Sequence, residues 1–142
     1  MTFAKPINKY IDYIDAPEDT FEQYVEKALK YNFRCVFANL QEYETGRAML
    51  EDSDIILAGA IDFPQGTMTL EEKLARFEEY AARGFTEIDY VLNQESVENR
   101  DFVAIEREMT TIADFCRAHG ITDKVIVEMC KLDSDDAAKR RV

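Results

Sequence analysis

Five short apolar runs alternate with amphipathic segments, and this alternation limits the folds open to the chain more than any other feature. The runs fall at about residues 10–14, 33–38, 55–61, 87–92 and 124–130. Strand-helix alternation with short connections predicts a parallel sheet, because parallel neighbours need a crossover that a helix supplies. Two α/β architectures fit five such units: part of a (β/α)8 TIM barrel, and an open flavodoxin-like parallel sheet.

Capping signals mark where two of the helices should begin. Thr20 precedes an apolar stripe, and Gln23 follows three residues later, which is the spacing of a capping box. Thr69 and Glu72 repeat this spacing before a second stripe. We therefore expect helices to begin directly after Thr20 and after Thr69. Two further helices are expected over about residues 42–50 and 102–118.

Two of the strand-like runs carry ionisable residues on a face that should be buried. Side-chain alternation puts Glu87 and Asp89 on one face of the fourth run, and Lys124, Glu128 and Cys130 on one face of the fifth. A doubly wound sheet is covered by helices on both faces and excludes charge there, whereas a barrel lumen that houses a reaction tolerates it. The strand faces therefore favour a partial barrel over the flavodoxin-like sheet.

The pair Asp89 and Lys124 points to proton transfer. On adjacent strands with both side chains inward, the two would lie within ion-pair range. A buried Asp-Lys pair suits proton abstraction next to a carbonyl or an imine. The alternative is a buried salt bridge that only fixes strand pairing. Lys124 is also a candidate nucleophile, because a desolvated lysine can form imines.

Composition and charge argue against several classes of function. The chain has 17 Lys and Arg against 29 Asp and Glu, and a net charge of −12 opposes nucleic-acid binding. No apolar run approaches membrane-spanning length, and the N-terminus lacks the apolar core of a signal peptide, so we expect a cytoplasmic protein. Cys35, Cys116 and Cys130 have no CxxC spacing and are expected to be reduced thiols. No metal and no other cofactor is expected, because no ligand cluster has metal spacing.

Five segments, in chain order, resemble motifs of one enzyme family. Residues 9–12 (KYID) are similar to its opening strand, and residues 33–39 to a second strand that ends in a Val-Asn-Pro-like turn. Residues 60–66 (AIDFPQG) are similar to a Val-Ile-Gly-Phe-Pro-x-Gly loop. Residues 87–93 (EIDYVLN) and 124–130 (KVIVEMC) are similar to Glu-Ile-Asp-Met-Val-Ile-Asn and Lys-Val-Ile-Ile-Glu-Thr-Cys. The chain thus resembles deoxyribose-phosphate aldolase, a class I aldolase that cleaves 2-deoxyribose 5-phosphate to glyceraldehyde 3-phosphate and acetaldehyde.

The resemblance implies roles for three residues. Asp89 matches the aspartate of the family's proton relay, and Lys124 matches a lysine that supports it. Asp12 matches an aspartate near the substrate hydroxyl and the relay. The implied partner is a small sugar phosphate. From the residues alone, Asp12 can equally be a residue that caps or solvates a strand end.

Three departures from the family pattern concern the substrate more than the fold. Where the family has Asp-His-Thr in its opening strand, this chain has Asp12 followed by Tyr13 and Ile14, so a threonine hydroxyl near the substrate is lost. The glycine before Phe-Pro is Asp62 here, and its carboxylate is expected to repel a phosphorylated sugar. Leu40 replaces the turn proline.

The family's Schiff-base lysine lies in a Lys-Thr-Ser-Thr-Gly motif on the sixth strand, which this sequence lacks. We therefore interpret residues 1–142 as a single domain, the N-terminal part of an aldolase-type barrel that is truncated in its sixth helix, with Asp133 or Ser134 as the helix cap. Open strand edges and uncovered apolar stripes predict a homo-oligomer or a complementing fragment.

Two functional hypotheses follow. In the first, the chain is part of a deoxyribose-phosphate aldolase-like lyase that is inert alone and competent only when completed. In the second, it is a non-catalytic sugar-phosphate-binding or interaction domain that kept the scaffold and lost the activity. Tyr13, Ile14 and Asp62 favour the second hypothesis, whereas the Asp89–Lys124 pair favours the first.

Overall fold

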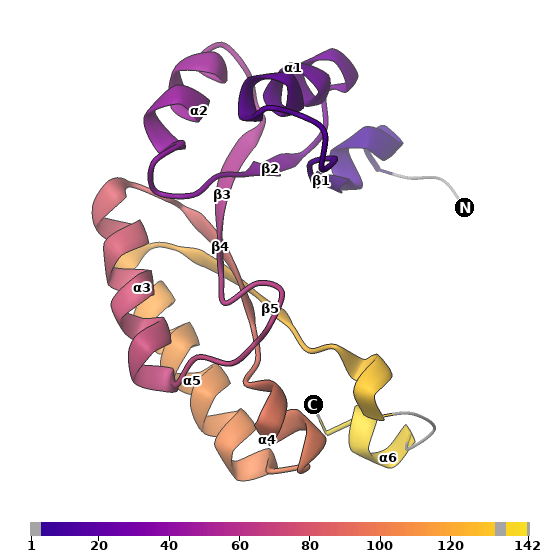
Figure 1. Ribbon diagram of the computed structural model, residues 1–142, viewed down its shortest axis with the longest axis vertical. Coiled ribbons are helices and arrows are strands. Elements are labelled where there is room, and N and C mark those ends of the chain that lie inside the picture. Colours follow the sequence, from indigo (N-terminus) through magenta and orange to yellow (C-terminus); the bar gives the residue numbers. More distant parts are fainter. Residues whose placement is uncertain (1–3, 133–135, 142) are drawn as a thin grey trace. The chain divides into compact units, whose positions relative to one another are not determined.

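Strands and helices alternate along the chain in the order that the apolar runs predict (Figure 1). The computed structural model describes residues 4–132 and 136–141. They form two compact units, Met1–Gly59 and Ala60–Val142, and strand β3 (Ile56–Ile61) runs from the first unit into the second. Each unit contains parallel strands that pair with each other and helices of its own.

The first unit contains η1 (Ile7–Tyr10), β1 (Asp12–Tyr13), α1 (Phe21–Tyr31), β2 (Cys35–Phe37), α2 (Tyr43–Met49) and the start of β3. Strand β2 pairs in parallel with both β1 and β3, with Cys35 opposite Asp12 on one side and opposite Ile56 on the other. The spatial order is therefore β1-β2-β3. In a flavodoxin-like sheet the first strand lies between the second and the third, so the observed order contradicts that alternative.

The first strand is shorter than the predicted run of residues 10–14. The strand consists of Asp12–Tyr13, whereas Ile7–Tyr10 forms the 3-10 helix η1. Within this turn the Lys9 amide donates to the Pro6 carbonyl at 3.0 Å. Backbone groups that would pair in a strand are thus satisfied locally, which stops the strand from extending upstream.

Helix α1 fixes the ends of β1 and β2 through one buried hydroxyl. The predicted capping box starts the helix, with the Thr20 and Gln23 side chains each accepting from the other residue's amide. The Tyr24 hydroxyl donates to the Tyr13 carbonyl at 2.5 Å and accepts from the Phe37 amide at 2.8 Å. Burial raises the pKa of Tyr24 well above its ordinary value, so the hydroxyl stays neutral.

The second unit contains the end of β3, then α3 (Leu70–Arg83), β4 (Glu87–Val91), α4 (Gln94–Glu98), α5 (Phe102–His119), β5 (Thr122–Ile126), η2 (Met129–Leu132) and α6 (Asp136–Lys139). The predicted capping box of Thr69 and Glu72 is present at the start of α3. The short helix α4 was not predicted; the Asn93 side chain caps it by accepting from the Ser96 amide. The predicted caps of the sixth helix, Asp133 and Ser134, lie outside the described residues.

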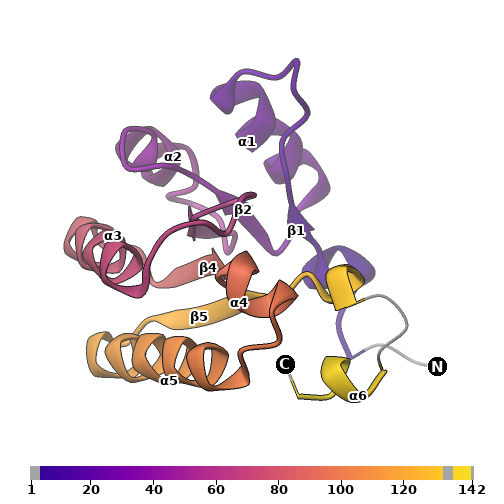
Figure 2. The same cartoon turned by 60° about the horizontal axis from the view of Figure 1, so that its bottom comes forward.

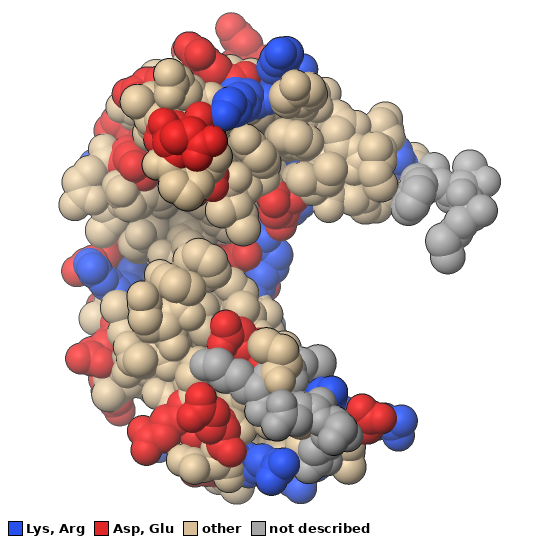
Figure 3. All heavy atoms as spheres, turned by 45° about the vertical axis from the view of Figure 1, so that its right-hand side comes forward, with Lys and Arg blue, Asp and Glu red and all other residues tan. Residues whose placement is uncertain are grey.

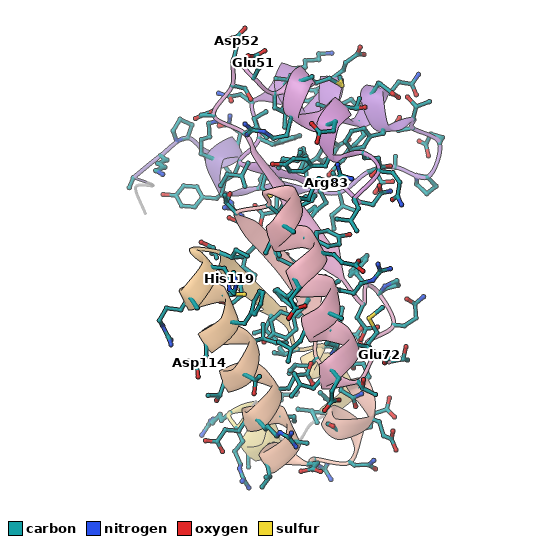
Figure 4. The ribbon with its side chains drawn as sticks, turned by 90° about the vertical axis from the view of Figure 1, so that its left-hand side faces the viewer. Glu51, Asp52, Glu72, Arg83, Asp114 and His119 are labelled. Atoms are coloured by element: carbon teal, nitrogen blue, oxygen red, sulfur yellow. The ribbon has the colours of Figure 1, made fainter. Side chains whose placement is uncertain are left out.

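Strands β4 and β5 run parallel, and helices α3 and α5 lie side by side along one face of them (Figures 1 and 2). Figure 4 shows these helices from outside, with Glu72 near the start of α3 and Asp114 on the side of α5 away from α3. Most of the side chains that these helices and strands bury are apolar. They include Phe77, Tyr80, Ile88, Tyr90, Ile105, Ile112 and Cys116.

The fifth strand ends earlier than the predicted run of residues 124–130. It covers Thr122–Ile126, and the chain then turns at Glu128, whose φ is +47°. A left-handed residue interrupts extended backbone, so the strand cannot continue to Cys130. The prediction that Glu128 and Cys130 share a strand face with Lys124 is therefore wrong.

A buried lysine occupies the centre of the packing between helices and strands in the second unit. The stripe predicted for α3 consists of Leu70, Leu74, Phe77 and Ala81. The side chains that α3 buries are Lys73, Phe77 and Tyr80 instead. The helix is therefore rotated from the predicted orientation, and a charged residue lies on its buried face.

Four parts of the second unit meet at the Lys73 ammonium. Its Nζ donates to the Val91 carbonyl and to Glu108 Oε1, both at 2.5 Å, and lies 3.4 Å from Asp62 Oδ2. All three side chains are buried: Lys73 is 0% exposed, Glu108 7% and Asp62 3%. One cation thus links α3, α5, the end of β4 and the loop after β3. A buried charge is tolerated only with such partners.

The loop after β3 is held closely against the end of β4. The Gly66 carbonyl accepts from the Gln94 amide at 2.8 Å, and Gly66 has a φ of +67°. A Cβ at Gly66 would lie 2.5 Å from the Leu92 carbonyl oxygen. Glycine is therefore required here both by the backbone conformation and by the close approach of a second backbone segment.

Replacing Tyr24 with Phe should lower the free energy of unfolding by about 1–3 kcal/mol at neutral pH, because two backbone groups lose their partner. Since the pKa of Tyr24 is raised on folding, wild-type stability is complete below the unfolded value of 10.0 and declines as the pH rises above it. The variant should show a shallower alkaline decline in urea unfolding. Tyr31→Phe is the control. Tyr31 is 55% exposed, so this variant should behave like wild type.

Replacing Lys73 with Met should lower the free energy of unfolding by about 3–5 kcal/mol, because Glu108 and Asp62 would be left as buried charges without their cation. Arg76→Met on the same helix is the matched control. Arg76 pairs with Glu79 at the surface, where both side chains are about half exposed, so its loss should cost less than about 1 kcal/mol. Equal losses for the two variants in denaturant unfolding would contradict the role given to Lys73.

Gly66→Ala should destabilise the protein by at least about 2 kcal/mol more than Gly120→Ala. Both glycines have a φ of +67°, so both variants carry the same backbone strain. At Gly120 an added Cβ meets no atom within 4 Å, whereas at Gly66 it meets backbone. The difference between the two unfolding midpoints therefore isolates the close approach of the loop to β4, and its absence would rule that approach out.

Candidate active site

Strands β4 and β5 bring the two predicted catalytic residues together. Asp89 lies opposite Lys124 in the strand register, and Lys124 Nζ is 2.9 Å from Asp89 Oδ1. Lys124 Nζ is also 2.9 Å from Glu87 Oε1. The expected ion pair is therefore present, within a cluster of two carboxylates and one ammonium. The catalytic roles of Asp89 and Lys124 stay a prediction.

The cluster lies on the face of β4 opposite to the helices. Tyr90 follows Asp89 in β4, so its side chain points to the other face. There it is buried against Phe77 of α3. Burial raises the pKa of Tyr90 well above its ordinary value, and the nearby charges of Asp123 and Glu108 raise it further. β4 thus separates two groups of charges. Glu87, Asp89 and Lys124 lie on one face, and Asp123 and Glu108 lie on the side of Tyr90.

The three residues of the cluster are buried to different extents. The side chains of Glu87, Asp89 and Lys124 are 6%, 14% and 30% exposed. Burial disfavours each charge, while attraction between opposite charges 2.9 Å apart favours them. Because two carboxylates face one ammonium, attraction favours the protonated lysine in particular. This arrangement can hold and move a proton, and it opposes the neutral amine that an imine-forming nucleophile needs.

Asp12, the predicted substrate-binding residue, belongs to the first unit and pairs there with Arg34. Arg34 Nε donates to Asp12 Oδ1 at 2.5 Å and Arg34 Nη2 donates to Oδ2 at 2.6 Å. Both side chains are about 30% exposed. A bidentate guanidinium-carboxylate pair is among the strongest side-chain contacts and fixes both partners. No feature of the sequence singled out Arg34.

Asp62 does not present the free charge that its position in the sequence suggests. Its Oδ1 accepts from the Thr67 amide at 3.0 Å and its Oδ2 from the Met68 amide at 2.9 Å. Lys73 lies on the other side of the carboxylate, and the side chain is 3% exposed. The expectation that Asp62 repels a phosphorylated sugar does not fit these contacts, because its carboxylate is buried and accepts from two amides beside the Lys73 ammonium.

Tyr13, which stands where the family has a histidine, packs into an aromatic cluster. Its ring centroid lies 5.3 Å from that of Tyr24 and 4.8 Å from that of Phe33. Ile14, in contrast, is 58% exposed. The change at Tyr13 therefore has a packing reason in the first unit, whereas the structure offers none for Ile14.

Three further observations concern the described residues as a whole. No helix there is both long and apolar enough to span a bilayer. Acidic and basic side chains are interspersed over the visible surface, with acidic ones prominent (Figure 3). Cys35 and Cys116 are buried free thiols and Cys130 is an exposed one, and burial raises the pKa of Cys116 to about 12.

Sequence reasoning missed Glu87 as a partner of Lys124 and missed the Lys73–Glu108 pair. For Glu87 a signal existed, because alternation already placed it on the face of Asp89. For Lys73 the signal was weaker: it stands four and seven residues before the buried Phe77 and Tyr80, at helical spacing. A charged residue type at such a position is ordinarily assigned to the solvent face.

The comparisons with known proteins agree on one family. No family model matches the sequence. The chain is 31% identical over 137 residues to deoxyribose-phosphate aldolase of Lactobacillus acidophilus, and the match covers 96% of this chain and 58% of that protein. It is 29% identical over 136 residues to the same enzyme of Clostridium perfringens, with 96% and 60% covered. The chain thus spans about three fifths of the length of these curated relatives.

Solved structures give the same result. A tetrameric deoxyribose phosphate aldolase from Aeropyrum pernix superposes with a TM-score of 0.68 at 27% identity, covering 92% of this chain and 57% of that one. An aldolase named QR15 superposes with a TM-score of 0.70 at 23% identity, which shows the fold alone. The α/β fold is that of a partial TIM barrel, and the predicted resemblance to the deoxyribose-phosphate aldolase family is confirmed over nearly the whole chain.

Proposed function

We propose that this chain carries the proton-relay part of a deoxyribose-phosphate aldolase-like active site. The reaction would be the reversible retro-aldol cleavage of 2-deoxyribose 5-phosphate to glyceraldehyde 3-phosphate and acetaldehyde. One observation carries the proposal: Lys124 and Asp89 form an ion pair at 2.9 Å on neighbouring strands, at the positions that the resemblance assigns to the relay. Roughly 30% identity over almost the entire chain supports it.

In the proposed reaction the two residues have different tasks. Asp89, as a carboxylate, exchanges a proton with the carbon next to the imine, and Lys124, as an ammonium, stabilises that carboxylate and returns protons to it. The imine itself forms on a lysine outside residues 1–142. Lys124 is a poor substitute nucleophile, because two carboxylates at 2.9 Å stabilise its protonated form.

We further propose that the chain is inert alone and works when a second polypeptide, or a longer form of the same one, supplies the remaining barrel units. The chain spans 58% of one curated relative and 57% of one solved relative. Small sugar phosphates would bind across both parts. A homo-oligomer is the other assembly that the uncovered edges favour.

A second candidate function is a non-catalytic sugar-phosphate-binding domain. The observation that favours it is the Asp12–Arg34 pair, in which both carboxylate oxygens already accept hydrogen bonds from a guanidinium. A residue meant to receive a substrate hydroxyl would be more useful without that competitor. Under this alternative the chain binds the sugar phosphate by itself and never turns it over.

Borohydride trapping separates these candidates. With acetaldehyde or deoxyribose 5-phosphate, the chain alone should form no stable adduct. Mixed with the remaining two fifths of the Lactobacillus relative, it should cleave deoxyribose 5-phosphate, and Asp89→Asn should reduce the rate by about 10²- to 10⁴-fold. Asp123→Asn, which removes the same charge from the other face of the sheet, is the control and should retain activity.

Three outcomes would count against the proposal. An adduct on the chain alone would contradict inertness, and its mapping to Lys124 would make that residue the nucleophile. Equal activity of Asp89→Asn and Asp123→Asn in the completed protein would remove Asp89 from the relay. Saturable binding of deoxyribose 5-phosphate by the chain alone, with no turnover after completion, would favour the non-catalytic domain.

A further inference from the structure

Lys124 is shared between two carboxylates, and one of them has no assigned task. Asp89 is the partner directly opposite Lys124 in the register, whereas Glu87 lies opposite Thr122, two residues earlier on β5. Lys124 Nζ nevertheless reaches Glu87 Oε1 at the same 2.9 Å as Asp89 Oδ1. The ammonium therefore sits between alternate residues of β4 rather than over one of them.

Glu87 is the more deeply buried of the two acids. Its side chain is 6% exposed, against 14% for Asp89. Burying a second carboxylate is costly unless a cation lies against it, and for Glu87 that cation is Lys124 at 2.9 Å. Glu87 and Asp89 each contact Lys124 at 2.9 Å, and each contact favours the protonated form of the lysine.

We propose that Glu87 is a positioning residue that holds Lys124 in its ammonium form and keeps its Nζ against Asp89. The inference rests on the proposed function and deepens it, since it divides the cluster into a charge-setting acid and a proton-exchanging acid. Glu87 anchors the lysine from the buried side, and the more exposed Asp89 faces the reaction. Lys124 then stays a proton donor and does not enter imine chemistry as a nucleophile.

Two other acids near these strands, Asp123 and Glu108, lie on the side of Tyr90. Asp123 and Glu108 act on Tyr90, which is buried on the helical side of β4. Glu108 pairs there with Lys73. The strand separates these charges from Lys124, whereas Glu87 and Asp89 contact it directly, so removing either contact should change its chemistry. Asp123 thereby becomes a control that is adjacent in sequence and equal in charge.

Reductive alkylation of Lys124 tests the proposal on the chain as it exists. Only the neutral amine reacts with acetaldehyde and cyanoborohydride, so the labelling rate at fixed pH reports the deprotonated fraction. Glu87→Gln should raise the rate at Lys124 by about tenfold or more, because losing one carboxylate partner shifts a protonation equilibrium by at least about one unit. Asp123→Asn should leave the rate unchanged. Mass spectrometry of proteolytic peptides gives the rate for each lysine.

A second measurement keeps a folding defect from mimicking the result. Lys73, which is fully buried in the same unit as Glu87, should stay unlabelled in both wild type and Glu87→Gln if the fold is intact. Glu87→Asp keeps the charge and should restore slow labelling of Lys124. Unchanged labelling of Lys124 in Glu87→Gln, or an equal increase in Asp123→Asn, would overturn the proposal. The labelling assay does not use deoxyribose 5-phosphate. A failure of the proposed function in the sugar-phosphate assays can therefore be distinguished from a failure of the role proposed for Glu87.

Discussion

The Lys73 ammonium is the contact on which the second unit most depends. It is fully buried, and it donates to Glu108 on α5 and to the Val91 carbonyl at the end of β4. On its third side it faces Asp62, which in turn accepts from two amides of the loop after β3. Apolar packing alone would leave these segments free to slide, because it is not directional. A buried cation with fixed acceptors allows one arrangement.

The same charge pattern occurs twice around β4, with different consequences. Lys73 on the helical side and Lys124 on the other side are each flanked by two carboxylates. Lys73 is 0% exposed and also bonded to backbone, so its proton has no route to a substrate. Lys124 is 30% exposed and pairs with the side chains of Glu87 and Asp89, so its proton can take part in chemistry. Exposure rather than composition separates a structural cluster from a candidate catalytic one.

Much of the fold follows from local patterns. Two capping boxes start α1 and α3 at the predicted residues, because the Thr-x-x-Gln and Thr-x-x-Glu signals act through bonds within one turn. The apolar runs predict the strands, although not their ends: β1 is cut short by a local 3-10 turn and β5 by a left-handed residue. Strand ends depend on which backbone groups find partners elsewhere, and periodicity does not report that.

The candidate site divides in the same way. Alternation along β4 and β5 was enough to place Asp89 and Lys124 on one face, because side-chain direction in a strand repeats every two residues. It could not show that Lys124 reaches Glu87 diagonally, or that Arg34 takes both oxygens of Asp12. Such contacts depend on rotamers and on strand register, which are set when the sheet assembles.

By itself, the sequence determined the order of the strands and the longer helices, the pairing of Asp89 with Lys124 and the family resemblance, because each rests on local periodicity or on residues at set spacings. Only the tertiary structure decided which charges neutralise which. It turned Asp62 from an expected repulsive group into the anchor of a loop, and placed Lys73 inside the protein. The physical reason is that the cost of a buried charge depends on partners from distant segments, and these meet only in the folded chain.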